Sequence, residues 1–161
     1  NQNERFENMT IRYNNVNALK KILEYTAENI SDEYARELID LSISYDNKEA
    51  LEALLKKGLL ADAGMTSKYT ALQNAVMDDK LDIAEKLIYY GADINAKTSS
   101  GNNLLHLAAE KGHFDMAKLL LKKGVDAKAK NNDRRRPDKV AKKAGHRNLF
   151  KYLKKARKGK L

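Results

Sequence analysis

A spacing of 33 residues organises most of this 161-residue chain. The segment 68–73 recurs as 101–106, and the register then holds as far as Gly91 in one copy and Gly124 in the next. Subtracting 33 once more reaches Gly58. A fixed period of this length is typical of stacked supersecondary units, each of which buries its apolar face against its neighbours. The spacing therefore predicts an array of repeats rather than a single globular core.

Within each copy the apolar residues fall at helical spacing in two runs. In the third copy these runs cover 104–109 and 114–121, and Gly112 stands between them. Glycine relieves left-handed backbone strain after a helix, so Gly112 and Gly124 are predicted to end the two helices. The polar segment 125–132 is predicted to be an extended loop. Each unit should therefore be a helix, a tight turn, a second helix and a long loop.

The sequence motifs of the copies resemble those of a known family. The third copy reads Asn-Leu-Leu-His-Leu-Ala-Ala at 103–109, then Gly-His at 112–113 and Leu-Leu-Leu at 119–121, and the second closes with Gly-Ala-Asp at 91–93. These motifs resemble the ankyrin repeat family, whose units run through Thr-Pro-Leu-His-x-Ala and a later Gly-His, Leu-Leu and Gly-Ala-Asp. The resemblance implies an all-α solenoid of about five stacked helix-turn-helix units, with extended loops or short β-hairpins between them.

The resemblance also implies how the chain is divided. It covers nearly the whole chain, most strongly over 66–131. The expected organisation is one ankyrin-repeat domain over 1–161: an N-terminal partial or capping repeat at 1–32, repeats at 33–65, 66–98 and 99–131, and a basic C-terminal capping repeat at 132–161. Terminal units have one face without a neighbour, so polar residues are expected to replace apolar ones there.

Signals for catalysis are weak. The chain has no cysteine, which excludes disulfides, thiolate metal sites and cysteine nucleophiles. It contains no nucleophile elbow, P-loop, dinucleotide fingerprint or zinc-binding histidine motif. His106 belongs to the family motif, and His113 and His146 occupy equivalent Gly-His turns, so all three are interpreted as structural. No enzymatic activity, cofactor or metal is expected.

Three carboxylates gather near one helix junction. Asp78, Asp79 and Asp82 could do acid–base chemistry, but nothing around them in the sequence indicates burial or a cleft. Asp79 takes the place of the turn glycine. Asp82 lies at the start of the second helix, where negative charge is favoured. They are interpreted as solvated turn and cap residues.

The resemblance implies a function in binding. Partners of ankyrin arrays usually lie against the concave side. This side is formed by the loop tips and by the exposed face of each first helix. Carried over by position, the predicted partner-binding residues are Tyr45, Tyr69, Met77, Asp78, Tyr90, Ser99, Asn102, Glu110 and Lys111. The three tyrosines are predicted to bind because an exposed tyrosine gives much contact area for little lost side-chain entropy. The alternative is that they pack against neighbouring repeats. We expect a monomeric, non-catalytic protein-interaction module.

The net charge of +9 is unevenly placed. Residues 127–161 hold 15 basic side chains against Asp133 and Asp138, a balance of +13, and the remaining residues have a balance of −4. A basic patch is predicted at Arg134, Arg135, Arg136, Lys139, Lys142 and Lys143. Clustered cations displace counterions from phosphates, so binding to nucleic acid or an anionic surface is the alternative function. A solubilising cap is favoured, because Phe150 and Tyr152 have core-like spacing and leave no stacking platform.

The sequence leaves the compartment open. No apolar run approaches the roughly 18–20 residues that cross a bilayer. The chain opens at Asn1 without methionine, which fits either a removed leader or an artificial start. A cytoplasmic protein and an exported one are both compatible with these features.

Overall fold

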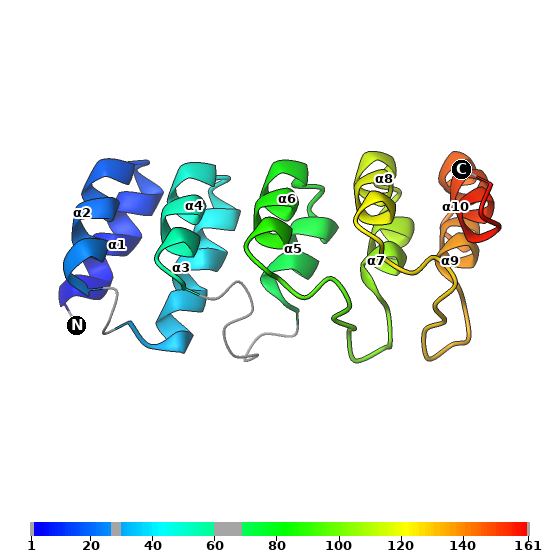
Figure 1. Cartoon of the computed structure of the whole chain (residues 1–161), viewed down its shortest axis with the longest axis horizontal. Helices are drawn as coiled ribbons and strands as arrows, with labels where there is room; N and C mark the ends of the chain where they lie inside the picture. Colours follow the sequence, from blue (N-terminus) through cyan, green and yellow to red (C-terminus); the bar gives the residue numbers. More distant parts are fainter. Residues whose placement is uncertain (1, 27–29, 60–68, 161) are drawn as a thin grey trace. The chain divides into compact units, whose positions relative to one another are not determined.

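The structure is a computed structural model that describes residues 2–26, 30–59 and 69–160. These ranges contain ten α-helices and no β-strand, which confirms the all-α repeat architecture (Figure 1). The helices are α1 (Gln2–Arg12), α2 (Val16–Thr26), α3 (Asp32–Ser44), α4 (Lys48–Lys56), α5 (Ala71–Met77), α6 (Leu81–Tyr89), α7 (Leu104–Lys111), α8 (Phe114–Lys122), α9 (Pro137–Lys143) and α10 (Arg147–Arg157). None of these helices is long and apolar enough to cross a membrane.

The described residues form two compact units. The first runs up to Leu72 and includes Asp82–Ala92, and the second comprises Gln73–Leu81 and the chain from Asp93 onward. The predicted repeat boundaries stay predictions. The boundary between 65 and 66 and the first residue of the 68–73 motif lie outside the described residues.

In the first unit two helix pairs pack on each other. Helix α1 contacts α2 and α3, and α2 and α3 both contact α4. The core between them is aliphatic, with fully buried Ile11, Leu19, Leu23, Leu38 and Leu51. The segment 1–32, predicted to be a partial or capping repeat, contains two helices, α1 and α2.

Ion pairs join α4 to α6 in the same unit. Glu52 accepts from Lys86 at 2.5 Å and pairs with Lys56 at 2.7 Å, and Lys48 pairs with Asp82. The hydrogen bonds from Lys56 and Lys86 lower the pKa of Glu52 to about 2. The pairs Glu52–Lys86 and Lys48–Asp82 therefore connect α4 to α6, whereas Glu52–Lys56 lies within α4.

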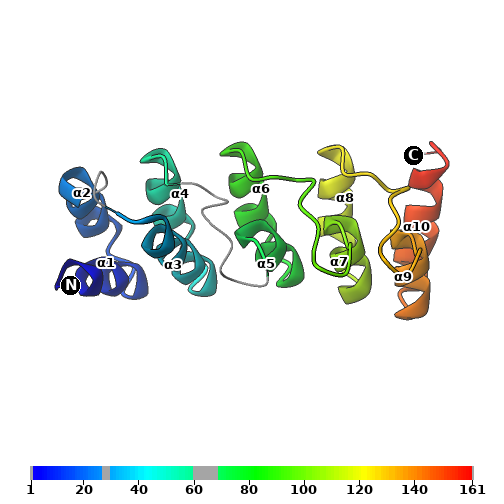
Figure 2. The same ribbon diagram turned by 90° about the horizontal axis from the view of Figure 1, so that it is seen from below.

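In the second unit α7 packs against α8 and α9, and α9 packs against α10 (Figure 2). Leu104, Leu105, Leu120 and Leu149 are buried in its core. The apolar runs of the third copy thus form the helices that the sequence predicted, and the 125–132 segment is a loop.

Helix α7 begins and ends as predicted. The side chain of Asn103 accepts a hydrogen bond from the backbone N–H of His106 at 3.2 Å, and the His106 ring accepts one from the N–H of Asn103. This reciprocal capping satisfies two amides that a helix start leaves free. At the other end Gly112 has a φ of +83°, a left-handed conformation that glycine adopts without strain.

Two successive loop tips are built alike and joined to each other. Thr98 donates its N–H to the carbonyl of Asn102, and one repeat later Asn131 donates to the carbonyl of Arg135, both at 3.0 Å. Asn132 connects the tips, because its backbone N–H donates to the carbonyl of Ser100 at 3.0 Å. The described loops are therefore tight hydrogen-bonded turns, without the β-strands of a regular hairpin.

Candidate interaction surface

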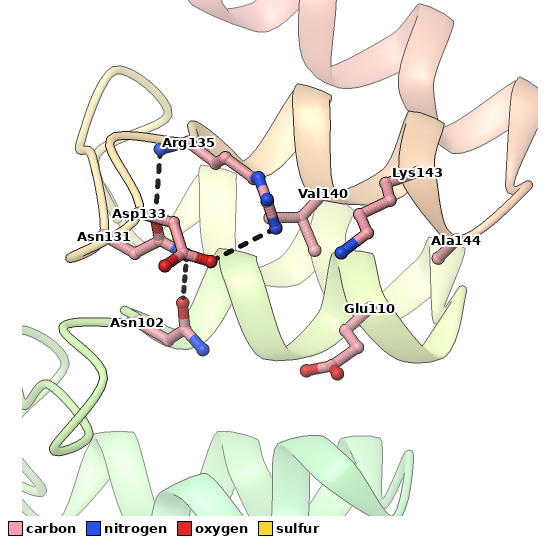
Figure 3. A pocket seen from close by; sticks show the side chains of 8 residues that line it. All are labelled: Asn102, Glu110, Asn131, Asp133, Arg135, Val140, Lys143 and Ala144. Atoms are coloured by element: carbon pink, nitrogen blue, oxygen red, sulfur yellow. Dashed lines mark hydrogen bonds and ion pairs between the residues drawn. The ribbon is translucent and has the colours of Figure 1, made fainter.

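A pocket of about 380 Å³ opens between α7 and α9 in the second unit (Figure 3). Two first helices and the loops that precede them supply its lining. The residues of this α7–α9 pocket are Asn102, Glu110, Asn131, Asp133, Arg135, Val140, Lys143 and Ala144.

Hydrogen bonds fix the loop end of the pocket. The side-chain amide of Asn131 donates to Asn102 Oδ1 at 2.8 Å, and Asn131 Oδ1 accepts from the backbone N–H of Arg135 at 3.0 Å (Figure 3). The guanidinium of Arg135 pairs with Asp133 at 3.2 Å. These residues have already satisfied much of their hydrogen-bonding capacity, so this end provides a preformed polar wall.

The helical walls carry free charges of opposite sign. Glu110 extends from α7 and Lys143 from α9, and both side chains are exposed (Figure 3). Within the described residues neither side chain has an ion-pair or hydrogen-bond partner. The pocket therefore presents one carboxylate and one ammonium group that are available to another molecule.

His106 positions the loop that forms the polar wall. Its Nε2–H donates to the carbonyl of Arg135 at 2.9 Å, while Nδ1 faces the N–H of Asn103. The ring is fully buried, and this burial lowers the pKa of His106. His106 thus forms a hydrogen bond across the turn between repeats, as its interpretation as a structural residue implies.

The other two histidines repeat a single structural role. His113 Nε2 contacts the carbonyl of Met77 at 2.9 Å, and His146 Nε2 contacts the carbonyl of Glu110 at 3.1 Å, each 36 residues back in the chain. Asn47 takes the same place in the first unit, where its amide donates to the carbonyl of Ile11 at 3.0 Å. The predicted structural role of the histidines is confirmed. The described residues contain no group of three metal-ligating side chains.

The pocket unites residues from two separately predicted sets. Asn102 and Glu110 belong to the predicted partner-binding residues, and Arg135 and Lys143 to the predicted basic patch. The 33-residue register relates them, because Arg135 follows Asn102, and Lys143 follows Glu110, by one period. That relation was available in the sequence, but the pairing of Arg135 with Asp133 and the freedom of Lys143 were not.

Other predicted partner-binding residues of the second unit lie around this pocket or elsewhere on its surface. Ser99 is exposed on a loop tip, where its carbonyl accepts from the side-chain amide of Asn132 at 3.1 Å. Lys111 is exposed at the end of α7. Met77 is half-buried at the end of α5, and Asp78 after it is exposed.

The three predicted tyrosines belong to the first unit and are not one cluster. Tyr45 is 48% exposed just before α4, and the Arg12 guanidinium lies 6.0 Å from its ring centroid. Tyr90 is half-buried near Lys56, at the other end of α4, with its ring edge-on to Tyr89 at 5.1 Å. Tyr69 is half-buried as well.

The predicted basic patch divides in the structure. Arg134 is exposed on the loop tip with a φ of +58°, and Arg136 is half-buried immediately before α9. Lys139 and Lys142 are exposed on α9, and the Lys142 ammonium lies 5.8 Å from the Phe150 ring centroid. Arg135 and Lys143 line the pocket instead.

Sequence reasoning missed a buried ion pair. Asp138 is 1% exposed, and it stands one period after the buried Leu105. Neither of its carboxylate oxygens has a hydrogen bond within the described residues, and Arg157 Nε lies 3.5 Å away. The 33-residue register was the available signal, since it places Asp138 where the two preceding repeats have leucine.

The fold defines an all-α repeat protein, and comparison with known families agrees. The chain matches the ankyrin repeats (3 copies) family over residues 8–98 and 72–160. It therefore belongs to the ankyrin repeat family, whose members are generally protein–protein interaction modules and typically non-enzymatic. No curated protein gives a significant match to the chain.

Proposed function

We propose that this chain is a non-catalytic interaction module that binds a partner protein in the α7–α9 pocket. The observation that carries the proposal is the pair of free, opposite charges on facing helices, Glu110 and Lys143. A partner that offers a cation to Glu110 and a carboxylate to Lys143 forms two new ion pairs. A partner that covers the pocket excludes water from these pairs, which strengthens them relative to pairs on an open surface.

The lining favours a protein over a small molecule. Small-molecule sites are predominantly apolar with a few polar groups, whereas Val140 and Ala144 are the apolar members of this lining. The side-chain NH2 of Asn102, which has no hydrogen-bond partner within the described residues, suits a carbonyl group of a peptide chain. The pocket thus has the mixed charge and hydrogen-bonding capacity of a protein interface.

The proposal extends to the wider predicted surface. Ser99 and Lys111 belong to the same unit as the pocket and would enlarge its contact area. Tyr45, Tyr69, Tyr90, Met77 and Asp78 are proposed as further contacts of a large partner. We propose that the module acts as a monomer, which light scattering on the purified chain tests.

A charge exchange tests the pocket. The variant Glu110→Lys with Lys143→Glu inverts both free charges and leaves the net charge unchanged. Its matched control is Asp115→Lys with Lys118→Glu, which inverts an exposed pair on α8 that is 3.1 Å apart. Affinity capture from the source organism is expected to lose its bound proteins with the pocket variant and keep them with the control. Retention of all bound proteins by the pocket variant would overturn the proposed site.

A further inference from the structure

The outward face of α10 carries an unbroken row of cations. At about 100° per residue, five basic side chains fall within an arc of about 100° around the helix axis. This α10 stripe consists of Arg147, Lys151, Lys154 and Lys155 on the helix and Lys158 directly after it, all of them exposed. The buried Leu149 and Leu153 occupy the opposite face of the helix, so the stripe points directly away from the core.

The chain around the stripe is almost purely basic. Residues 139–161 contain ten basic side chains and no acidic one. Within the described residues no member of the stripe has an ion-pair partner, and the nearby Asp138 is paired with Arg157. Like charges at a spacing of four residues destabilise a helix. A solubilising cap does not require this arrangement, because charges of mixed sign keep a surface soluble without the repulsion.

We propose that the α10 stripe binds the phosphate backbone of double-helical nucleic acid. From Arg147 to Lys158 the stripe extends about 16 Å, at about 1.5 Å per residue. Counting both strands, a duplex carries a phosphate charge about every 1.7 Å of helix axis, so a stretch about 16 Å long holds about nine phosphates for the five cations. Four of the five cations are lysines, which act as point charges on phosphate and read no sequence.

The surroundings of the stripe disfavour single strands. Proteins that bind single strands stack bases on exposed aromatic rings. Phe150 is half-buried, with the ammonium groups of Lys142 and Lys154 at 5.8 and 5.7 Å from its ring centroid. Tyr152 packs against the ring of Phe114 at 5.0 Å. Both rings are half-buried and have neighbouring side chains against them, unlike the exposed rings that stacking uses.

The same surroundings disfavour insertion into a membrane. A helix that lies in a membrane surface needs an apolar face that can enter the lipid. The apolar face of α10 is buried, and α10 packs against α9. Among the described residues, the large hydrophobic side chains that are exposed all lie before residue 90. The stripe is therefore suited to phosphates that approach it from solvent.

A salt titration with matched variants tests this proposal, independently of the α7–α9 pocket. The probe is a labelled, mixed-sequence DNA duplex about two helical turns long, followed by fluorescence anisotropy between about 50 and 200 mM salt. For wild type the plot of log K against log salt is expected to have a slope of about −4. The variant Lys151→Gln, Lys154→Gln, Lys158→Gln should reduce the magnitude of that slope by about 3.

The controls separate position from total charge. The variant Lys20→Gln, Lys21→Gln, Lys57→Gln removes the same charge from exposed lysines of the first unit and should keep the wild-type slope. The triple Lys→Arg variant at positions 151, 154 and 158 keeps the charge and should bind like wild type. Circular dichroism confirms that each variant is folded.

Several results would overturn the proposal. The first is no binding of the duplex at about 50 mM salt. The second is equal weakening by the stripe variant and the first-unit control, which would show that only total charge matters. The third is stripe-dependent binding that is tighter to a single strand, to phosphatidylserine vesicles or to polyglutamate than to the duplex.

Discussion

The imidazole of His106 holds the start of α7 and the loop before α9 together. One ring nitrogen completes the cap of α7 with Asn103, and the other donates to the carbonyl of Arg135 at 2.9 Å. Because Arg135 lines the α7–α9 pocket, this buried ring also fixes the polar wall of the proposed site. Loss of its neutral form should therefore loosen both the repeat and the pocket.

Acidification should destabilise the fold through His106. Burial lowers its pKa in the folded state below the value of about 6.5 expected in the unfolded chain. The unfolded state then binds more protons, so this contribution is present above about pH 6.5 and is lost as the pH falls through the lower folded value. In urea denaturation, His106→Gln should be less stable than wild type near neutral pH and lose less stability on acidification. Parallel pH profiles for the two proteins would contradict this role.

Asp138 and Arg157 form a pair whose two members depend on each other. Removing one partner of a buried pair leaves an uncompensated charge, which costs about 3–5 kcal/mol at fully buried sites. The Arg157 side chain keeps 25% exposure, so we expect Asp138→Ala to cost less, about 2 kcal/mol. The double variant Asp138→Leu with Arg157→Met should be at least as stable as wild type, because leucine is the residue of the equivalent position in α7. Denaturant midpoints that rank the single variant above the double one would refute this interpretation.

The turns between paired helices share one left-handed position. Gly112 and Gly145 occupy it in the second unit, and Asp79 with a φ of +56° takes the same place one period earlier. Asp46 does so in the first unit with a φ of +51°. Aspartate is among the few residues besides glycine that adopt this region with any frequency. The interpretation of Asp79 as a turn residue is confirmed.

Gly112 should tolerate substitution less well than Gly124. A Cβ at Gly112 would lie 2.6 Å from the His146 ring, whereas at Gly124 it would meet no described atom within 4 Å. Both positions have positive φ, so each alanine carries backbone strain of roughly 1–2 kcal/mol. Thermal or urea unfolding should show Gly112→Ala to be less stable than Gly124→Ala by at least about 1 kcal/mol, because only the former displaces His146. Equal losses would show that the ring moves aside freely.

Local chemistry explains which elements were predictable. The ends of α7 follow from Asn103 and Gly112, whose capping depends only on neighbouring residues. The N-terminal α1 lacks the repeat motif, so the sequence predicted only a partial or capping repeat where the structure has the helix pair α1 and α2. The burial of Asp138 depends on Arg157, which is 19 residues away, and periodicity does not report such pairing.

For the whole molecule, the sequence predicted which kind of surface would bind a partner better than it predicted which residues line that surface. It placed Asn102 and Glu110 on the face of first helices and loop tips, and the structure brings both to one pocket. It treated Arg135 and Lys143 as part of a separate basic patch, although the same pocket includes them. Side-chain pairing across repeats decides which charges stay free, and such pairing appears only in three dimensions.

The two proposed sites lie on different elements, so they can be tested separately. Glu110 and Lys143 face the pocket from α7 and α9, whereas the α10 stripe lies on a second helix. The Lys→Gln stripe variant is therefore expected to keep its protein partners, and the pocket charge exchange to keep its affinity for a duplex. Affinity capture and anisotropy on both variants check this independence. Loss of both activities in either variant would mean that the two surfaces form one site.

Site-specific photo-cross-linking tests whether the α7–α9 pocket is the surface that meets a partner protein. A photoreactive amino acid replaces Glu110, whose side chain is exposed and unpaired within the described residues, and in a control protein it replaces the exposed Lys122 of α8. Irradiation in the source organism should give a defined adduct with another protein from position 110 and none from position 122. Adducts from position 122 alone, or from neither position, would contradict protein binding in this pocket.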